Sequence, residues 1–395
     1  MADLLSIDGA QRLILERARP LPAERVPLAE AAGRVVAEPA LASVDLPPFD
    51  SSAMDGFAVR AADTPGSLPI RGGVAAGRPA ESMLAAGTAM GIATGGEVPP
   101  GADAVVPIEA VGTEDNNVEV PAVEVGANVR PQGGDLRAGE TVARPGERVT
   151  PGRLGALAAA GLAEVRCARR PRAVVVPTGT ELRRPGEPLR RGEVYEANGL
   201  ILAAQLSAAG AVVERRAAVG DDEAEHRAVL EEALEADVLV TSGGVSVGPH
   251  DLVRRVEAEL GVEEVFWRVA VKPGKPISFG VRGETLVFGL PGNPVSALVG
   301  FELFVKPAIL ALQGVPEPLP PFEPGRLAGS RRRNPERDEL VRARRSLADG
   351  AVLEPLGGQE SHMIARAAAA DALVLVPRGE GELEPGSIVR YLRLD

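Results

Sequence analysis

From about residue 172 onward, short apolar runs alternate with longer segments whose apolar residues have helical spacing. Short β-branched runs bounded by Gly and Pro predict strands, and the longer segments predict amphipathic helices. The expected strands cover 173–176, 237–241, 265–271, 277–279 and 286–288, and another begins at Val212. The expected helices cover 198–209, 223–235, 249–260 and 294–312. Because strands alternate with helices, we expect a mostly parallel sheet that is covered on both faces.

The expected helices have recognisable starts. Asp222 is followed three residues later by Glu225, which is the pattern of a capping box. Pro249 and Pro294 stand at first helical positions, and Asn293 can cap the second of these helices. These starts set the boundaries of the helices that follow the strand-end loops.

The N-terminal part of the chain has a different pattern. Residues 1–45 carry apolar residues with a period near 3.6, interrupted by Pro20 and Pro22, and residues 151–161 also look helical. The first 45 residues would present two apolar faces, one formed by Leu4, Ile7, Leu13 and Ile14 and the other by Val26, Leu28, Ala31 and Val35. We expect an elongated helical segment built from residues 1–45 and 131–168.

Two further parts of the chain have the texture of small β domains. Residues 46–130 contain short β runs that are broken by Gly and Pro, and a proline-rich linker at 316–324 precedes a second such part. The expected fold is therefore multidomain α/β. Its domains are 1–45 plus 131–168 (elongated helical), 46–130 (inserted β), 169–315 (α/β) and 316–395 (β-barrel-like).

Composition narrows the functions that are open to this chain. The 395 residues carry a net charge of −12, which argues against general nucleic-acid binding, so an anionic ligand would need a local basic pocket. The single cysteine, Cys167, excludes an intramolecular disulfide and fits a reducing cytoplasm. The start of the chain lacks the pattern of a signal peptide, and no apolar run approaches about 18 residues, so we expect no membrane span.

Three glycine-containing loops follow expected strands. They are P-T-G-T-E-L at 177–182, T-S-G-G-V-S-V-G at 241–248 and L-P-G-N-P-V-S at 290–296. Ligands of open α/β sheets bind at the carboxyl ends of strands, and glycines let the backbone approach a phosphate. Each loop alone is a common turn, and none matches a P-loop or a dinucleotide fingerprint. Together, each behind a strand, they favour a phosphate-binding site.

Charged residues in and near these loops suggest a metal ion and an oxyanion. Glu181 and Asp251 follow two different strands and would hold Mg²⁺ if the strands are neighbours, although Asp251 could equally serve only the helix dipole. Asp221 has the same ambiguity. Two of the three lysines of the chain, Lys272 and Lys275, lie in the stretch V-K-P-G-K-P. They form a basic site for an oxyanion, or they are two ordinary surface residues.

Other residues give weaker signals. Asp55 and Asp135 lie in glycine-flanked loops outside the α/β region, where a lone Asp is usually a turn former. They matter only if a domain or a partner subunit brings them to the pocket. No His/Cys spacing suits zinc, and no serine lies in a nucleophile elbow, so covalent catalysis has no support.

Six motifs in the same order resemble a known family over essentially the whole chain. They are S-A-M-D-G-F-A-V-R, T-G-G-E-V-P-P-G-A-D-A-V-V, T-G-T-E-L, T-S-G-G-V-S-V-G-P-H-D, K-P-G-K-P and L-P-G-N-P-V-S-A. The chain resembles the molybdopterin molybdenumtransferases, the MoeA family that includes the E domain of gephyrin. One departure is Arg268, which stands where many relatives have Lys.

The resemblance implies a fold and an activity. It implies a cytoplasmic homodimer of four-domain subunits in which residues 169–315 bind molybdopterin. It implies the Mg²⁺-dependent transfer of molybdate onto adenylylated molybdopterin with release of AMP, and it suggests a molybdopterin adenylyltransferase as a partner. Two other readings remain: that adenylyltransferase itself, whose fold resembles residues 172–312, and a non-enzymatic scaffold.

The resemblance also implies roles for individual residues. Glu181 and Asp251 match the magnesium ligands. The loops for the pterin phosphate and the nucleotide are matched by Ser242, Gly243, Gly244, Pro291, Gly292, Asn293 and Pro294. Residues near molybdate are matched by Lys272, Lys275, Ser296, Arg337 and Ser361. Asp55 and Thr94 match residues of the partner subunit, and the catalytic set is completed by Asp135 and Asp221 beside Asp55 and the two lysines.

Overall fold

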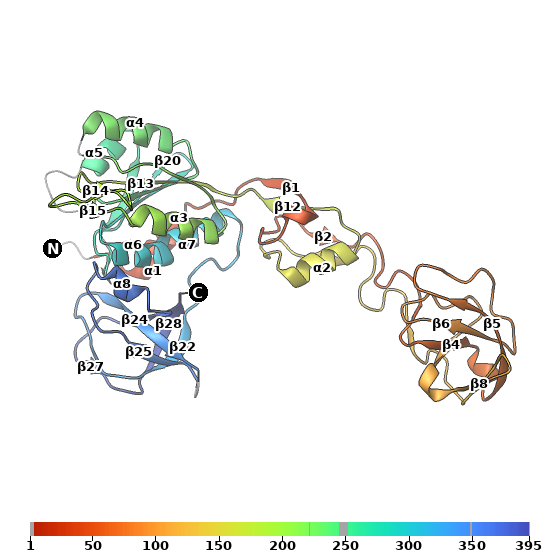
Figure 1. The fold of residues 1–395 in the computed structure, drawn as a ribbon. Helices are drawn as coiled ribbons and strands as arrows, with labels where there is room; N and C mark the ends of the chain where they lie inside the picture. Colours follow the sequence, from red (N-terminus) through yellow and green to blue (C-terminus); the bar gives the residue numbers. More distant parts are fainter. Residues whose placement is uncertain (1–3, 221, 245–251, 348–349, 395) are drawn as a thin grey trace. The chain divides into compact units, whose positions relative to one another are not determined.

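The computed structural model describes residues 4–220, 222–244, 252–347 and 350–394. The chain divides into two compact units (Figure 1). Unit 1 comprises Met1–Glu24 and Ala168–Asp395, and unit 2 comprises Arg25–Cys167. Unit 1 contains the α/β part of the chain and the C-terminal β structure, and with them the three glycine-containing loops at 177–182, 241–248 and 290–296.

A six-stranded mixed sheet forms the centre of unit 1. Its order is β16 (Val212–Arg215), β13 (Arg172–Pro177), β17 (Val238–Ser242), β21 (Thr285–Leu290), β20 (Ser278–Arg282) and β18 (Glu263–Trp267). The first four strands are parallel, whereas β20 and β18 are antiparallel to their neighbours. The sheet is mostly parallel, as expected, and its antiparallel edge arises because only residues 283–284 connect β20 to β21, and so short a connection makes a hairpin.

Helices cover both faces of this sheet, as the sequence predicts (Figure 1). Alternate residues of β13 point to opposite faces, since side chains alternate along a strand. Val175 packs in the cluster that contains Leu202 of α3 (Asn198–Ala208). Val174 packs in the cluster that contains Leu230 of α4 (Glu223–Ala233) and Val256 of α5 (Leu252–Glu259). Asp222 caps α4 as expected, because its Oδ1 accepts a hydrogen bond from the N–H of Glu225 at 2.8 Å.

The long helix expected at 294–312 is interrupted by a π turn. It consists of α6 (Pro294–Gly300), η4 (Phe301–Val305) and α7 (Lys306–Leu312). Pro307 has no N–H to give to Leu303, and the amide of Gln11 donates to that free carbonyl at 2.9 Å. The 19-residue stretch is longer and more apolar than we expected from the sequence, and by length and composition it could cross a membrane, yet 78% of its 18-residue apolar window is buried inside the protein. It is a core helix.

Five strands of the C-terminal part close into a ring. They are β22 (Glu323–Leu327), β24 (Asp338–Ser346), β25 (Val352–Pro355), β26 (Ala372–Val376) and β28 (Ile388–Arg393), and β24 pairs with both β25 and β26. The two-residue strand β19 (Val271–Lys272) joins β24 in parallel. The single strand expected at 265–271 is therefore wrong: β18 ends at Trp267, and Arg268 has a left-handed φ of 75°.

Unit 2 contains a second six-stranded sheet. Its order is β7 (Ala104–Pro107), β4 (Gly56–Val59), β6 (Ala89–Ile92), β5 (Gly66–Val74), β9 (Asn117–Val120) and β8 (Gly112–Glu114). Phe57 and Val59 pack on one side and Ala58 on the other. The β runs expected near 57–59, 90–93, 104–107 and 118–120 are confirmed.

The predicted elongated helical segment is wrong over most of residues 1–45. Its helix, α1 (Ile7–Leu15), is followed by β1 (Ala23–Pro27), the 3₁₀ turn η1 (Leu28–Glu30) and β2 (Ala40–Leu41). Pro27 cannot donate a helical hydrogen bond, and β1 pairs with β12 (Glu164–Ala168) instead. The helically spaced Val26 and Ala31 pack around Leu157 of α2 (Pro151–Ala159), so their period reflects burial against another helix.

The remaining elements are short. They are β3 (Ser51–Ser52), η2 (Ala61–Asp63), η3 (Ile108–Ala110), β10 (Val129–Arg130), β11 (Thr141–Ala143), β14 (Leu182–Arg183), β15 (Val194–Tyr195), β23 (Arg331–Arg332), α8 (Ile364–Ala367) and β27 (Glu382–Leu383).

Candidate functional site

Strand order brings the three glycine-containing loops together. The strands β13, β17 and β21 are adjacent and parallel, with Pro177 opposite Ser242 and Ser242 opposite Leu290. The loops that leave their carboxyl ends line a cavity of about 790 Å³. The predicted site residues in its wall are Glu181, Ser242, Gly243, Gly244, Pro291, Gly292, Asn293 and Pro294. The structure thus places the predicted pterin and nucleotide loops around one space.

The loop that begins at Thr241 needs glycine for a steric reason. Gly243 has a φ of 100°, and a Cβ there would lie 2.5 Å from the carbonyl oxygen of Thr178. The backbone N–H of Thr178 in turn donates to the carbonyl of Ser242 at 2.9 Å. The 177–182 and 241–244 loops are therefore held in backbone contact, which leaves no room for a side chain between them.

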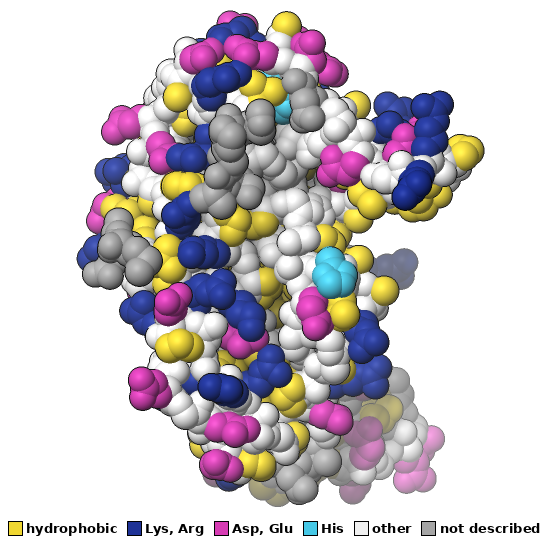
Figure 2. Space-filling model, turned by 90° about the vertical axis from the view of Figure 1, so that its left-hand side faces the viewer, with side chains coloured by type: hydrophobic (Ala, Val, Ile, Leu, Met, Phe, Trp, Pro, Cys, Tyr) yellow, Lys and Arg dark blue, Asp and Glu magenta, His cyan; other side chains and the backbone are white. Residues whose placement is uncertain are grey.

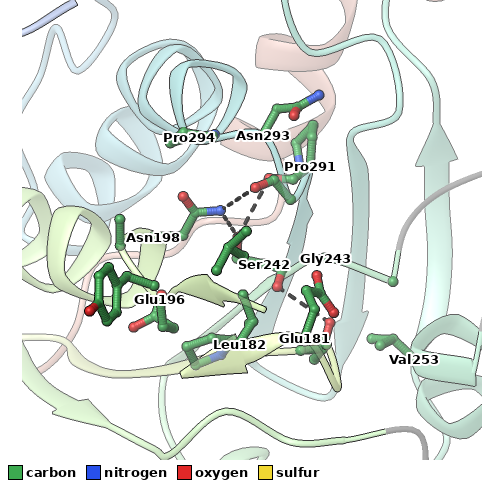
Figure 3. A pocket seen from close by; sticks show the side chains of 18 of the residues that line it. Glu181, Leu182, Glu196, Asn198, Ser242, Gly243, Val253, Pro291, Asn293 and Pro294 are labelled. Atoms are coloured by element: carbon green, nitrogen blue, oxygen red, sulfur yellow. Dashed lines mark hydrogen bonds between the residues drawn. The ribbon is translucent and has the colours of Figure 1, made fainter. Parts of the chain in front are cut away.

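Asn198, which the sequence did not single out, ties two of the loops together. Its side-chain amide donates to Oγ of Ser242 and to the carbonyl of Gly292, each at 2.8 Å (Figure 3). Asn198 is the first residue of α3 and is 9% exposed. An Asn at a helix start ordinarily indicates a cap, so its link to two loops far away in the sequence depends on the tertiary fold.

Glu196 is a second residue that the sequence did not indicate. Its carboxylate accepts a hydrogen bond from the N–H of Gly199 at 2.6 Å and pairs with Arg215 at 3.4 Å. The carboxylate is almost buried and lies in the cavity wall (Figure 3). A signal was present in the sequence, because Glu196 stands three residues before the glycine whose amide it binds. Such a short-range pattern is too common to mark a site by itself.

Glu181 is the carboxylate that the structure makes available in the cavity (Figure 3). It is exposed, and its oxygens turn back over Gly179. Among the residues that the structure describes, none forms a hydrogen bond or an ion pair with this carboxylate. Asp251 and Asp221 lie outside the described residues. A carboxylate with free lone pairs fits Mg²⁺, which usually takes one or two protein carboxylates and completes its shell with water and phosphate oxygens.

Asn293 does not cap its helix in the way the sequence suggests. It occupies the position before α6, but its side chain makes no capping hydrogen bond. It lines the cavity instead (Figure 3). The first N–H of α6, that of Val295, is bound to the carbonyl of Ser361, so the helix presents the positive end of its dipole to the cavity, and this end favours an anion.

The residues predicted to lie near molybdate are not in the wall of this cavity. Pro276, the neighbour of Lys275, does line it. Basic side chains gather near the middle of one face of unit 1, although acidic ones are spread over the whole of that face (Figure 2). Lys272 is committed to an ion pair, since its Nζ lies 3.2 Å from Oε1 of Glu339, and the same oxygen accepts from Arg331 at 3.1 Å.

Lys275 differs from Lys272 in this respect. In the described ranges, no carboxylate lies within ion-pair distance of the Lys275 ammonium. Ser296 is 3% exposed. The carbonyl of Ser361 accepts the N–H of Val295 at 3.1 Å, which ties the C-terminal part to the first turn of α6. Arg337 is partly exposed and its N–H binds the side chain of Asn334 at 2.9 Å.

Asp55, Thr94 and Asp135 belong to unit 2. The N–H of Thr94 donates to Oδ1 of Asp55 at 2.7 Å, so the two predicted partner-subunit residues adjoin each other. Asp135 is exposed, and its N–H donates to the carbonyl of Leu46 at 2.9 Å. The structure brings Asp55 and Thr94 together, and their meeting with the cavity of another subunit stays a prediction.

The fold and the cavity define a multidomain α/β protein whose α/β part places glycine-rich backbone and the carboxylate of Glu181 at the carboxyl ends of parallel strands. Three family models match consecutive parts of the chain. They are described as the MoeA N-terminal region, domains I and II (residues 5–161), a probable molybdopterin binding domain (174–311) and the MoeA C-terminal region, domain IV (324–394).

Individual relatives agree with these models. A molybdopterin molybdenumtransferase 2 of Mycobacterium tuberculosis is 39% identical over 97% of this chain and 98% of its own length. A molybdopterin molybdenumtransferase of Haemophilus influenzae is 39% identical over 79% of this chain and 78% of its own. A solved MoeA structure from Pyrococcus horikoshii is 28% identical, with a TM-score of 0.85, and covers 99% of this chain and 100% of its own. The chain belongs to the MoeA family of molybdopterin molybdenumtransferases, which are transferases of molybdenum cofactor biosynthesis.

Proposed function

We propose that this protein transfers molybdate onto adenylylated molybdopterin, releases AMP and requires Mg²⁺. The observation that carries the proposal is the cavity of about 790 Å³ that the three strand-end loops line in a member of this family. We also propose that the protein is a cytoplasmic homodimer. In this dimer each site contains residues of both subunits, and the partner subunit supplies Asp55 and Thr94. A molybdopterin adenylyltransferase then supplies the adenylylated substrate.

The chain's own groups position the phosphates. The Gly244 backbone and the positive end of α6 face anionic oxygens at the carboxyl ends of β17 and β21. The N–H groups of Gly243 and Val295 are already bound to the carbonyls of Leu290 and Ser361. Asn198 holds the loops that bear these groups at a fixed separation through its two hydrogen bonds. Preorganised donors of this kind stabilise charge without rearranging during the reaction. Nothing in this arrangement needs a side chain to act as a nucleophile.

A metal ion and a lysine would complete the site. Glu181 and Asp251 would hold Mg²⁺, which polarises the phosphoanhydride when it is bound. Lys275 would attract the molybdate oxyanion, because its ammonium is not engaged by a carboxylate of the described residues. Lys272 would contribute less charge there, since Glu339 already neutralises it at 3.2 Å.

Release of AMP tests the proposal. Purified protein is mixed with adenylylated molybdopterin and Mg²⁺, and AMP is measured with and without molybdate. Release that depends on molybdate supports the transferase. Formation of adenylylated molybdopterin from ATP and molybdopterin would instead identify an adenylyltransferase, and an inert protein would favour a scaffold.

Matched variants test the metal ligand. Glu181→Gln keeps the size of the side chain and removes its charge, so AMP release should fall by at least about tenfold and recover in part at high Mg²⁺. Glu187→Gln is the control, because Glu187 is exposed in the segment between β14 and β15 and does not line the cavity. Equal activity of the two variants would remove Glu181 from the metal site.

The two lysines form a second matched pair. Lys275→Ala should raise the molybdate concentration that is needed for half-maximal rate more than Lys272→Ala does. The reason is that the ammonium of Lys272 is already paired with Glu339. If the two variants need the same molybdate concentration, the assignment of Lys275 is wrong.

Complementation tests the shared site. Asp55→Asn alone and Glu181→Gln alone should each keep about a tenth of wild-type activity or less. After the two are mixed and the subunits exchange, half of the dimers carry one intact site, so about a quarter of wild-type activity should return. A mixture whose activity does not rise above that of the separate variants would show that Asp55 acts within its own subunit or not at all.

A further inference from the structure

One ring nitrogen of a buried histidine in the cavity wall has no hydrogen-bond partner among the described residues. His226 lies on α4, is 2% exposed and lines the cavity that also contains Gly244 and Val253. Its Nδ1 is buried, and no group of the described residues bonds to it. The ring thus combines full burial with an unpaired polar atom at the edge of a ligand cavity.

The surroundings of His226 would suit an apolar side chain better. One helical turn further along α4, Leu230 is fully buried in the cluster that also contains Val219 and Val256. A buried polar atom without a partner destabilises the folded protein, whereas a leucine at this position would extend the apolar cluster. Retention of an imidazole here is explained if the ring gains a partner when the cavity is filled.

The unpaired nitrogen also determines which atom meets the ligand. A buried N–H without an acceptor is rarer in proteins than an acceptor without a donor, so an unpaired Nδ1 places the N–H of the ring on Nε2. Nε2 then carries the N–H that is open to a ligand. An N–H donor complements an oxygen that can only accept.

The adjacent wall indicates which ligand oxygen this is. Gly244 has a left-handed φ of 65°, and its Cβ position is taken by the side chain of Val253. At Gly243 and Gly244 the wall of the cavity is therefore backbone, as it is in loops that approach phosphates. We propose that His226 binds a phosphoryl oxygen of the nucleotide part of the ligand through Nε2–H. This inference rests on the proposed function.

The test uses three substitutions that separate donor position from burial. Gln places its amide nitrogen close to the position of Nε2, Asn places its amide near Nδ1, and Leu has no donor. Binding of AMP and of adenosine is measured calorimetrically in the presence of Mg²⁺, together with the Tm of each variant. Adenosine is the control ligand, because it lacks the phosphate.

We expect His226→Leu and His226→Asn to weaken AMP binding by about tenfold or more, and His226→Gln to stay within about threefold of the wild type. Adenosine binding should not change, and the Tm of His226→Leu should equal or exceed that of the wild type, because an unpaired polar atom has been removed. Unchanged AMP binding by His226→Leu, or an equal loss for AMP and adenosine, would overturn the inference. A wild-type protein that binds neither ligand would instead refute the proposed function.

Discussion

Asn198 offers the most direct test of how the cavity is built. Its side-chain amide connects the loops after β17 and β21, because it donates hydrogen bonds to Ser242 Oγ and to the Gly292 carbonyl, each at 2.8 Å. Asn198→Ala removes both donors without adding bulk. The Gly292 carbonyl then loses this hydrogen bond, and Ser242 keeps only a long contact of 3.5 Å to the carbonyl of Pro291.

The size of the effect follows from the number of bonds lost. Each net hydrogen bond is worth about 1 kcal/mol, and a buried group left unpaired costs more, so the variant should lose about 2–3 kcal/mol of unfolding free energy. For a unit of this size that corresponds to a fall in Tm of about 5–10 °C. Because the loops are no longer held at a fixed separation, AMP affinity should also fall by about tenfold.

Gln313→Ala is the matched control. Its amide donates to two buried carbonyls, those of Ala209 and Ile309, each at 2.9 Å, and it does not line the cavity. It should lose similar stability in urea unfolding while binding AMP like the wild type. If Asn198→Ala binds AMP as tightly as Gln313→Ala does, the two hydrogen bonds of Asn198 do not organise the site.

Three further results are expected. Burial raises the pKa of Asp237, but hydrogen bonds from Arg169 and from a backbone N–H lower it by more than burial raises it. The net pKa therefore lies below the ordinary value of 3.8. The ionised carboxylate therefore stabilises the fold above that value and loses this effect as pH falls through the lowered pKa. Asp237→Asn should cost about 2 kcal/mol at pH 7 and less near pH 3 in urea unfolding; an equal cost at both would refute this. Gly243→Ala should bind AMP at least about tenfold more weakly, because its Cβ meets Thr178; unchanged affinity would disprove the steric argument. Gln11→Ala should lower Tm by about 2–4 °C, since the carbonyl freed by the helix proline loses its donor, and an unchanged Tm would show that water replaces it.

Local patterns predicted much of unit 1. Strands such as β13 and β17 are continuous apolar runs because both faces of their sheet are covered, and that signal is strong in any sequence. The cap of α4 by Asp222 is likewise a contact over three residues. The helical reading of residues 16–45 failed because Val26 and Ala31 are spaced for burial against α2, and spacing alone does not distinguish a helix from turns that pack on one.

The loops of the candidate site were recognisable, whereas the residues that hold them were not. Ser242, Gly243 and Asn293 stand out because glycine and proline mark the ends of strands. Asn198 and His226 do not stand out, since their significance depends on atoms that are distant in the sequence. Lys272 looked equivalent to Lys275 until the pairing of β19 with β24 brought it to Glu339.

The sequence by itself determined most elements of the α/β part, the three strand-end loops and the family, because these depend on short-range patterns and on the order of motifs. The tertiary structure alone decided which strands are neighbours, and hence that the ends of β13, β17 and β21 surround one cavity. It also decided which polar groups are paired there and which are left for a ligand. Pairing depends on distances of about 3 Å between residues far apart in the chain, and no local pattern encodes such distances.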